Sequence, residues 1–332
     1  MSAIFEFATA NRVMFGAGKA HEAAGVLRDL GARRLLLVTG KNPSRSGPLR
    51  EQLTRAGIDV IAFSVSGEPT VELAAEGAAI AAREGCAAVI GFGGGSALDA
   101  GQAIAALATT PGDPLEDLEV IGRAQALRHA PLPFVAIATT AGTGSEVTRI
   151  AVLLSRAHRV KVSLRSPLML PTAAIVDPDL LTGAPASVLV SSGVDALSQL
   201  IEPFLSPKAN PLTDSLAREG IRRSVRALRP AVLEGSTTER REDLAVASLF
   251  GGVCLANAGL GAVHGFAAPA GGMFEAPHGA VCAALLAPVV AVNARALRER
   301  AMGHPSLDRL EELGALVTSR PHATAEDAIT WL

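Results

Sequence analysis

The chain has 332 residues, 49% of them apolar and 19% charged, which is the composition of a folded protein and a length typical of two domains. The net charge is -2 and no segment concentrates Lys or Arg, so the sequence shows no basic segment of the kind that binds nucleic acid. Tyrosine is absent, which excludes any reductase mechanism that uses a tyrosine hydroxyl as its acid.

The cysteines and the first residues indicate the compartment. Cys86, Cys254 and Cys282 lie far apart, each in an apolar stretch, which favours buried thiols in a reducing compartment over disulfides. The first residues have no basic segment, and Glu6 interrupts their apolar run, so they do not resemble a signal peptide. We therefore expect a cytoplasmic protein.

One long uncharged stretch raises the question of a membrane span. Mean hydropathy is +0.33, and residues 244–274 contain no Asp, Glu, Lys or Arg. The stretch also contains repeated glycines, Asn257, His264 and Pro269, and no aromatic residues flank it. This composition favours a pair of buried helices, so we expect no membrane segment.

The first half of the sequence alternates two periodicities. Short apolar runs predict strands at 35–39, 60–65, 87–92, 134–139 and 173–176. Amphipathic stretches between them predict helices at 19–30, 48–56, 71–84 and 96–107. The order indicates an α/β fold with a doubly wound, Rossmann-like parallel sheet. Residues 150–164 alternate in polarity and predict a hairpin attached to that sheet.

The second half has only helical periodicity. Helices are predicted at 187–205, 212–228, 238–258, 278–300, 306–317 and from 323 to the end. Prolines punctuate this half at Pro203, Pro207, Pro211, Pro230 and Pro288, and a linker is expected near 178–186. The sequence therefore predicts a nucleotide-binding domain over 1–182 and an all-helical domain over 183–332.

Two glycine-rich loops each follow a predicted strand. Residues 93–99 read Gly-Gly-Gly-Ser-Ala-Leu-Asp, and residues 139–146 read Thr-Thr-Ala-Gly-Thr-Gly-Ser-Glu. Glycines let the backbone approach a ligand, and a helix N-terminus offers amides to a phosphate. The alternative is two tight turns with Ser96 and Ser145 as helix N-caps. Two such loops at strand ends favour a nucleotide site.

The helical half contains a candidate metal site. Asp195 and Gln199 are four residues apart and so share one helix face, and His264 and His278 each lie in an apolar, uncharged context. A carboxylate with two imidazoles suits Fe²⁺ or Zn²⁺. Spacing alone leaves open that both histidines are satisfied structural residues.

Five motifs in order resemble one family. They are 93–99, 139–146, Asp-Pro-x-Leu at 177–180, Asp-Ala-Leu-Ser at 195–198 and Pro-His-Gly at 277–279. The whole chain is similar to iron-containing alcohol dehydrogenases, which share the dehydroquinate synthase-like fold with glycerol dehydrogenase. The resemblance implies an NAD(P) cofactor held by Gly94, Gly95, Ser96, Asp99, Thr139, Thr140, Thr143, Ser145 and Lys161. It also implies a catalytic metal held by Asp195, His264, His278 and the residue at position 199.

The chain departs from the family at particular positions. Gln199 stands where the family has a histidine ligand, Ala268 where a further histidine is common, and Gln102 where a lysine is usual. Since an amide oxygen is a neutral donor, we expect weakly bound, exchangeable Fe²⁺ or Zn²⁺. The chain also ends sooner than the family's members usually do, so the helical domain is expected to be incomplete at its C-terminus.

The resemblance implies hydride transfer between NAD(P)(H) and a small alcohol or aldehyde, with the metal polarising the substrate oxygen. Two alternatives remain open at this point. One is a maleylacetate-type reductase with little metal dependence, and the other is a catalytically silent nucleotide-binding member.

Two further expectations concern cofactor choice and assembly. Gly40 follows a strand at the point where an acidic residue selects NAD, and Lys41 and Asn42 come next, so NADP is slightly favoured over NAD. A plain polar turn is the alternative. Residues 4–13 read as an extended edge segment with exposed Phe5 and Phe7, which predicts a homodimer through it.

Overall fold

The computed structural model describes residues 4–110, 112–274 and 276–332. The chain divides into two compact units. The α/β unit comprises Thr9–Thr140 and Gly144–Thr182. The helical unit comprises Gly183–Leu332 together with Ala141–Thr143 and the residues up to Ala8.

A parallel sheet forms the centre of the α/β unit. Among the described residues six strands pair in the order β1-β8-β5-β4-β2-β3. Their bounds are Val13–Phe15 for β1, Arg34–Thr39 for β2, Asp59–Ser64 for β3, Ala88–Gly93 for β4, Phe134–Ala138 for β5 and Ala173–Val176 for β8. The five predicted strands are confirmed. Strand β1 was missed because three residues are too few to show a pattern.

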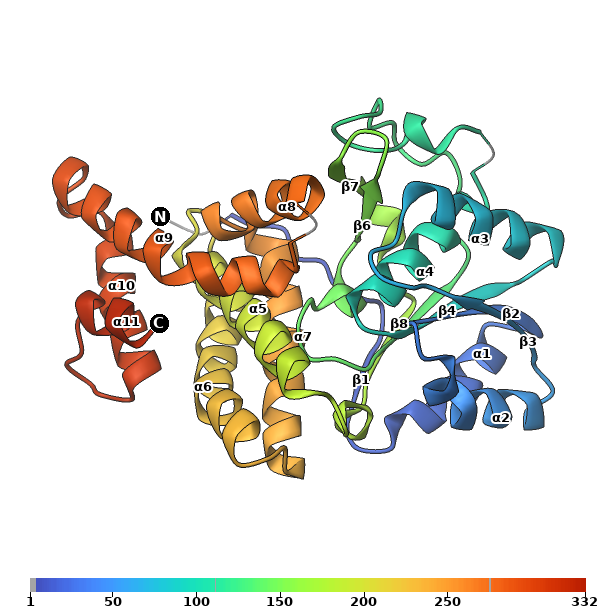
Figure 1. The fold of residues 1–332 in the computed structure, drawn as a ribbon, viewed down its shortest axis with the longest axis horizontal. Helices are drawn as coiled ribbons and strands as arrows, with labels where there is room; N and C mark the ends of the chain where they lie inside the picture. Colours follow the sequence, from blue (N-terminus) through green and yellow to red (C-terminus); the bar gives the residue numbers. More distant parts are fainter. Residues whose placement is uncertain (1–3, 111, 275) are drawn as a thin grey trace. The chain divides into compact units, whose positions relative to one another are not determined.

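Helices cover both faces of this sheet (Figure 1). Helices α1 (Ala23–Asp29) and α2 (Gly47–Arg55) pack on the face that contains Leu35 and Leu37, as one apolar core. Helix α4 (Gly95–Leu107) and the end of α3 (Val71–Arg83) pack on the opposite face, with Leu36 and Val38. Because successive residues of a strand point to opposite faces, burial on both faces explains the unbroken apolar runs. The doubly wound fold is confirmed.

The predicted hairpin exists, but its attachment to the main sheet was wrong. Strands β6 (Ile150–Ser155) and β7 (Val160–Arg165) pair with each other in a separate antiparallel sheet. Their apolar residues form a core cluster with residues of α3 and α4. Alternating polarity predicts a strand with one buried face, and here helices, not strands, bury it.

The helical unit is built from seven described helices. They are α5 (Ala186–Leu205), α6 (Pro211–Leu233), α7 (Thr238–Ala258), α8 (Ala262–Phe274), α9 (His278–Arg300), α10 (Pro305–Thr318) and α11 (Ala325–Trp331). Pro203, Pro230 and Pro288 lie inside helices and do not end them, which corrects the expectation that they punctuate this half. Each proline removes one backbone hydrogen bond, and the helices around them share an apolar core that holds the segments in place.

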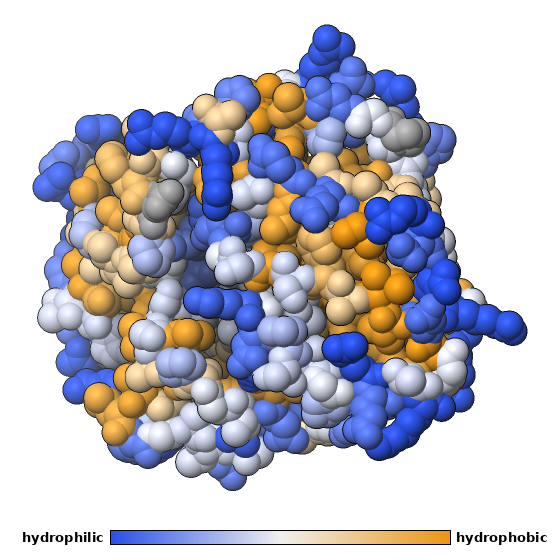
Figure 2. Space-filling view, turned by 45° about the vertical axis from the view of Figure 1, so that its right-hand side comes forward, coloured by the Kyte–Doolittle hydropathy of each residue, from blue (hydrophilic) through white to orange (hydrophobic). Residues whose placement is uncertain are grey.

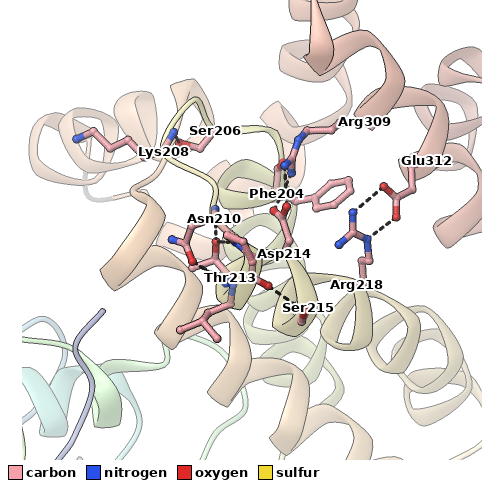
Figure 3. Close-up of polar contacts among 12 residues, drawn as sticks. Phe204, Ser206, Lys208, Asn210, Thr213, Asp214, Ser215, Arg218, Arg309 and Glu312 are labelled. Carbon is pink, nitrogen blue, oxygen red and sulfur yellow. Dashed lines mark hydrogen bonds and ion pairs between the residues drawn. The ribbon is translucent and has the colours of Figure 1, made fainter. Parts of the chain in front are cut away.

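Paired charges tie α10 to the helices beside it (Figure 3). Arg309 donates two hydrogen bonds of 2.7 Å each to the carboxylate of Asp214 on α6, and one to the Phe204 carbonyl. Arg218 is paired with Glu312 on α10. Both guanidinium groups lie over the Phe204 ring: that of Arg218 is 5.3 Å from the ring centroid, and that of Arg309 is 5.2 Å from it. The aromatic ring and the two ion pairs together fix α10 on the helical unit.

Apolar surface remains exposed on the helical unit. Phe266 and Phe274 of α8 are 62% and 73% exposed, so the second helix of the stretch 244–274 is buried on one face only, and not throughout as expected. Among the described residues, α5 and α9 are long and apolar enough to cross a membrane, judged by length and composition alone. If the bent pair α7 and α8 formed a single span, it would be a third candidate. Figure 2 shows apolar and polar side chains intermixed over the face that it presents.

Candidate active site

Three buried polar side chains lie along one face of α5. Asp195, Gln199 and Glu202 are each less than 10% exposed, and their spacing of four and then three residues places them on successive turns. Buried carboxylates are costly unless they are paired or bind a cation. This face of α5 therefore marks a site.

Helix α8 brings His264 to this face through a glycine turn. Gly259 ends α7 with φ of 73°, a left-handed conformation that glycine adopts readily. At Gly261 a Cβ atom would stand 2.7 Å from Glu202 Oε1, so a side chain at this position would displace the carboxylate from where it lies. The Val263 amide donates to Glu202 Oε1 at 2.7 Å, and His264 follows at the next position.

Helix α9 supplies the rest of the cluster. His278 is its first residue and Cys282 follows one turn later, so both point from one face. His264 Nε2 lies 3.2 Å from Asp195 Oδ1, and His278 Nε2 lies 3.6 Å from the same oxygen. Asp195, His264, His278 and Cys282 each offer one ligand atom, and these atoms all lie within 4.8 Å of one another. The predicted residues Asp195, His264 and His278 are thus brought together.

Glu202 orients the imidazole of His264. Its Oε2 lies 2.6 Å from His264 Nδ1, which places the ring proton on Nδ1 and directs Nε2 toward Asp195. Burial lowers the pKa of His264, but Asp195, Cys282 and Glu202 outweigh it and raise that pKa to about 11. A cation is therefore favoured at this position, whether a proton or a metal ion.

These residues fit a divalent metal. The set offers a carboxylate, two imidazoles and a thiol, which are the ligand types that Fe²⁺ and Zn²⁺ take in proteins. In the described part of the chain, the buried Gln199 Oε1 on the same helix face has no hydrogen-bond partner. Glu202 supplies the outer carboxylate that commonly orients a metal-binding histidine.

In the α/β unit, three loops converge at the carboxyl ends of neighbouring strands. The Thr139 amide donates to the Gly93 carbonyl at 2.8 Å, and a Cβ atom on Gly93 would lie 3.5 Å from the Gly40 nitrogen. A Cβ atom on Gly94 would stand 3.0 Å from Thr140 Oγ1. The loops after β2, β4 and β5 therefore meet where open α/β folds bind nucleotides.

The glycine loops do not use serine caps. Helix α4 begins at Gly95 after Gly94, an N-cap without a side chain, and not after Ser96. The 3-10 turn Ser145–Val147 likewise follows Gly144, so Ser145 is not an N-cap. The first-turn amides of α4 are thus left without a side-chain cap, which suits an anion.

The carboxyl of Asp99 is buried in this unit, within range of the charges of Glu68 and Lys161. Burial raises the pKa of Asp99 to about 7, although hydrogen bonds from Ser145 and the Val152 amide lower it. The charges of Glu68 and Lys161 also act on Asp99, and Lys161 Nζ donates to Glu68 Oε1 at 2.9 Å. A buried carboxyl that accepts from a hydroxyl, with a lysine charge nearby, can bind a polar ligand.

Some predicted residues are not part of these groups. Thr143 belongs to the helical unit, whereas the other predicted cofactor residues belong to the α/β unit. Asn42 is exposed, and its Oδ1 accepts a hydrogen bond from Ser44. Sequence reasoning gave no role to Glu202 or Cys282. The signal that could have found them is spacing, since each shares a helix face with a predicted ligand.

Comparison with known proteins assigns the chain to a family. The family model for iron-containing alcohol dehydrogenase matches residues 10–178, and the model for the C-terminal part of the Fe-containing alcohol dehydrogenase family matches residues 189–330. The chain is 36% identical to 1,3-propanediol dehydrogenase of Klebsiella pneumoniae, over 95% of this chain and 85% of the relative. It is 34% identical to NAD-dependent methanol dehydrogenase of Bacillus methanolicus, over 96% and 83%.

Comparison with a solved structure supports the same family. A crystal structure of 1,3-propanediol oxidoreductase superposes with a TM-score of 0.89 at 34% identity, covering 99% of this chain and 85% of that one. The parallel sheet with a C-terminal helical domain is thus the fold of this family. The chain belongs to the iron-containing alcohol dehydrogenase family and is an oxidoreductase of the alcohol and aldehyde class.

Proposed function

We propose that this chain transfers a hydride reversibly between a nicotinamide cofactor and a short primary alcohol or its aldehyde, with a divalent metal as Lewis acid. The observation that carries the proposal is the cluster of Asp195, His264 and His278, whose ligand atoms converge in the helical unit. The relatives' names, which specify propanediol and methanol, support a small alcohol.

Residues of the helical unit would hold the metal and orient it. Asp195, His264 and His278 supply ligand atoms, and Glu202 accepts a hydrogen bond from Nδ1–H of His264, which keeps the Nε2 lone pair free for the metal. When bound, the metal would polarise the substrate oxygen and stabilise alkoxide character during hydride transfer. This chemistry needs no side-chain phenol as an acid, which agrees with the absence of tyrosine from the chain.

Residues of the α/β unit would hold the cofactor. We assign the pyrophosphate to the first-turn amides of α4 at Gly95 and Ser96, because Gly94 leaves them without a side-chain cap. The hydroxyls of Thr139 and Thr140 lie on the adjacent loop. Lys161, paired with Glu68 beside Asp99, would contact the nicotinamide half.

We further propose that NADPH is accepted and slightly preferred. Gly40 places no carboxylate after β2, so nothing there repels a 2′-phosphate. A Cβ atom at Gly40 would meet nothing within 4 Å, and the backbone there is not left-handed, so Gly40→Asp is tolerated by the fold. We expect that Gly40→Asp shifts kcat/KM toward NADH. A wild type that strongly favours NADH, with no change in the variant, would contradict this assignment.

One experiment separates the proposed function from its alternatives. Metal content is measured by elemental analysis alongside oxidation of NADH and NADPH with a panel of short aldehydes. Turnover that requires metal supports the proposal. Turnover by the metal-free protein supports a maleylacetate-type reductase, and cofactor binding without turnover supports a silent protein.

A further inference from the structure

Cys282 belongs to the cluster of possible ligand atoms, but the proposed function gives it no role. The side chain is fully buried, one helical turn after His278 on α9, and its Sγ lies 3.9 Å from His264 Nε2. Its sulfur is one of the four ligand atoms that lie within 4.8 Å of one another. Of the chain's cysteines, Cys254 instead donates to the Thr213 carbonyl at 3.4 Å, so it has a partner of its own.

The distances match those between the ligands of a tetrahedral ion. With usual bond lengths, neighbouring ligands stand about 3.4 Å apart for nitrogen and oxygen, and about 3.6 Å apart for nitrogen and sulfur. The separations here are 3.2 Å from His264 to Asp195, 3.6 Å from His278 to Asp195, and 3.9 Å from Cys282 to His264. These three separations differ from the tetrahedral values by a few tenths of an ångström, and all four ligand atoms lie within 4.8 Å of one another.

Gln199 is the other candidate for the fourth ligand of the metal. It lies on the same face of α5 as Asp195, and its Oε1 is buried with no hydrogen-bond partner among the described residues. An amide oxygen is neutral and hard, whereas a thiolate is anionic and binds Zn²⁺ strongly. One thiolate and one carboxylate would also neutralise both charges of the ion.

We propose that Cys282 is the fourth protein ligand, so that this chain holds its metal with one aspartate, two histidines and one cysteine thiolate, and that Gln199 is dispensable. The inference rests on the proposed metal-dependent function. On binding, the sulfur–metal bond forms as the Cys282 S–H bond breaks, and the proton passes to solvent without any change in oxidation state. The soft ligand favours Zn²⁺ or Co²⁺ over Fe²⁺.

The test uses Co²⁺ on the full chain after metal removal by a chelator. A cobalt–thiolate bond gives an intense charge-transfer band in the near ultraviolet, and any protein-bound tetrahedral Co²⁺ gives visible d–d bands. We expect both in the wild type. In Cys282→Ser the near-ultraviolet band is lost while weaker visible bands remain, and Zn²⁺ affinity falls by at least about tenfold, which is the lower bound for losing even an outer-shell partner.

Two matched variants act as controls. Cys254→Ser replaces another fully buried cysteine of the helical unit and should keep the near-ultraviolet band. Gln199→Leu removes the competing oxygen at similar volume and should keep both the band and the Zn²⁺ affinity. Loss of the band in Gln199→Leu but not in Cys282→Ser would overturn the proposal.

The wild-type spectrum is decisive even if a variant fails to fold. Visible bands without a thiolate band would overturn the role of Cys282 and leave the metal-dependent function standing. Failure of the wild type to bind Co²⁺ or Zn²⁺ at all would contradict the metal site itself, and with it both proposals.

Discussion

The contact between Glu202 and His264 predicts that a buried residue outside the ligand set controls metal affinity. The Glu202 side chain is 6% exposed, and its two oxygens accept from two different donors, the Val263 amide at 2.7 Å and His264 Nδ1 at 2.6 Å. The substitution Glu202→Gln keeps the shape and replaces one acceptor by an NH₂ donor. Whichever way the amide turns, one of the two donors loses its acceptor.

The cost can be estimated from these contacts. If the NH₂ group faces Nδ1, the ring proton moves to Nε2 and His264 cannot bind a metal without a tautomer change. If the amide turns over, the buried Val263 N–H is unpaired, at about 1–3 kcal/mol. Loss of such outer partners lowers metal affinity by about 10–100-fold, or about 1.4–2.8 kcal/mol. We expect a loss in this range.

The assay is competition for Zn²⁺ between the protein and a chromophoric chelator. Glu312→Gln provides a matched control, because Glu312 also accepts two hydrogen bonds in the helical unit, but from Arg218 and away from the ligands. The control should keep the wild-type affinity. Equal affinities in all three proteins, or equal losses in both variants, would refute the argument that Glu202 orients His264.

Three other outcomes are expected. Burial raises the pKa of Glu146 from 4.5 to about 7, so the stability that its protonated form contributes is present below about pH 4.5 and lost as pH rises to about 7. The stability of Glu146→Gln relative to wild type, from chemical denaturation, should thus increase by about 2–3 kcal/mol between about pH 5 and about pH 8, and no increase would contradict the burial argument. Asp214→Ala should lower the free energy of unfolding by about 2 kcal/mol through the lost Arg309 pair, against less than about 1 kcal/mol for Glu326→Ala at an exposed pair, and equal costs would refute this ranking. Light scattering should show a homodimer, with Phe5 43% exposed on the segment proposed to pair, and a monomer at micromolar concentration would refute the proposed pairing.

Sequence periodicity sufficed for the α/β unit because its strands are buried on both faces. Leu35–Leu37 and Phe134–Ala138 are nearly inaccessible to solvent, so every position in them is apolar and the runs stand out. Pairing was harder to predict. The alternation of 150–164 shows that one face is buried, but not that helices α3 and α4 bury it.

The candidate site, too, was predictable from the sequence only in part. Spacing along one helix predicts a shared face, which is how Asp195 and Gln199 were chosen together. It does not tell which other helix meets that face, so the approach of Glu202 to His264 and of Cys282 to His264 needed tertiary structure. The segment at the chain start is a similar case, because Asn257 of α7 exchanges two hydrogen bonds with the backbone of Ala8 and thereby holds it against the chain's own helix.

We propose that metal bound by Asp195, His264 and His278 is required for hydride transfer. The most direct test measures the oxidation of reduced nicotinamide with a short aldehyde, in protein stripped of metal and then reloaded with Zn²⁺ or Fe²⁺. We expect that stripping abolishes turnover, that reloading restores it, and that His264→Ala loses both bound metal and turnover. Undiminished turnover in the stripped protein, or in His264→Ala, would contradict it.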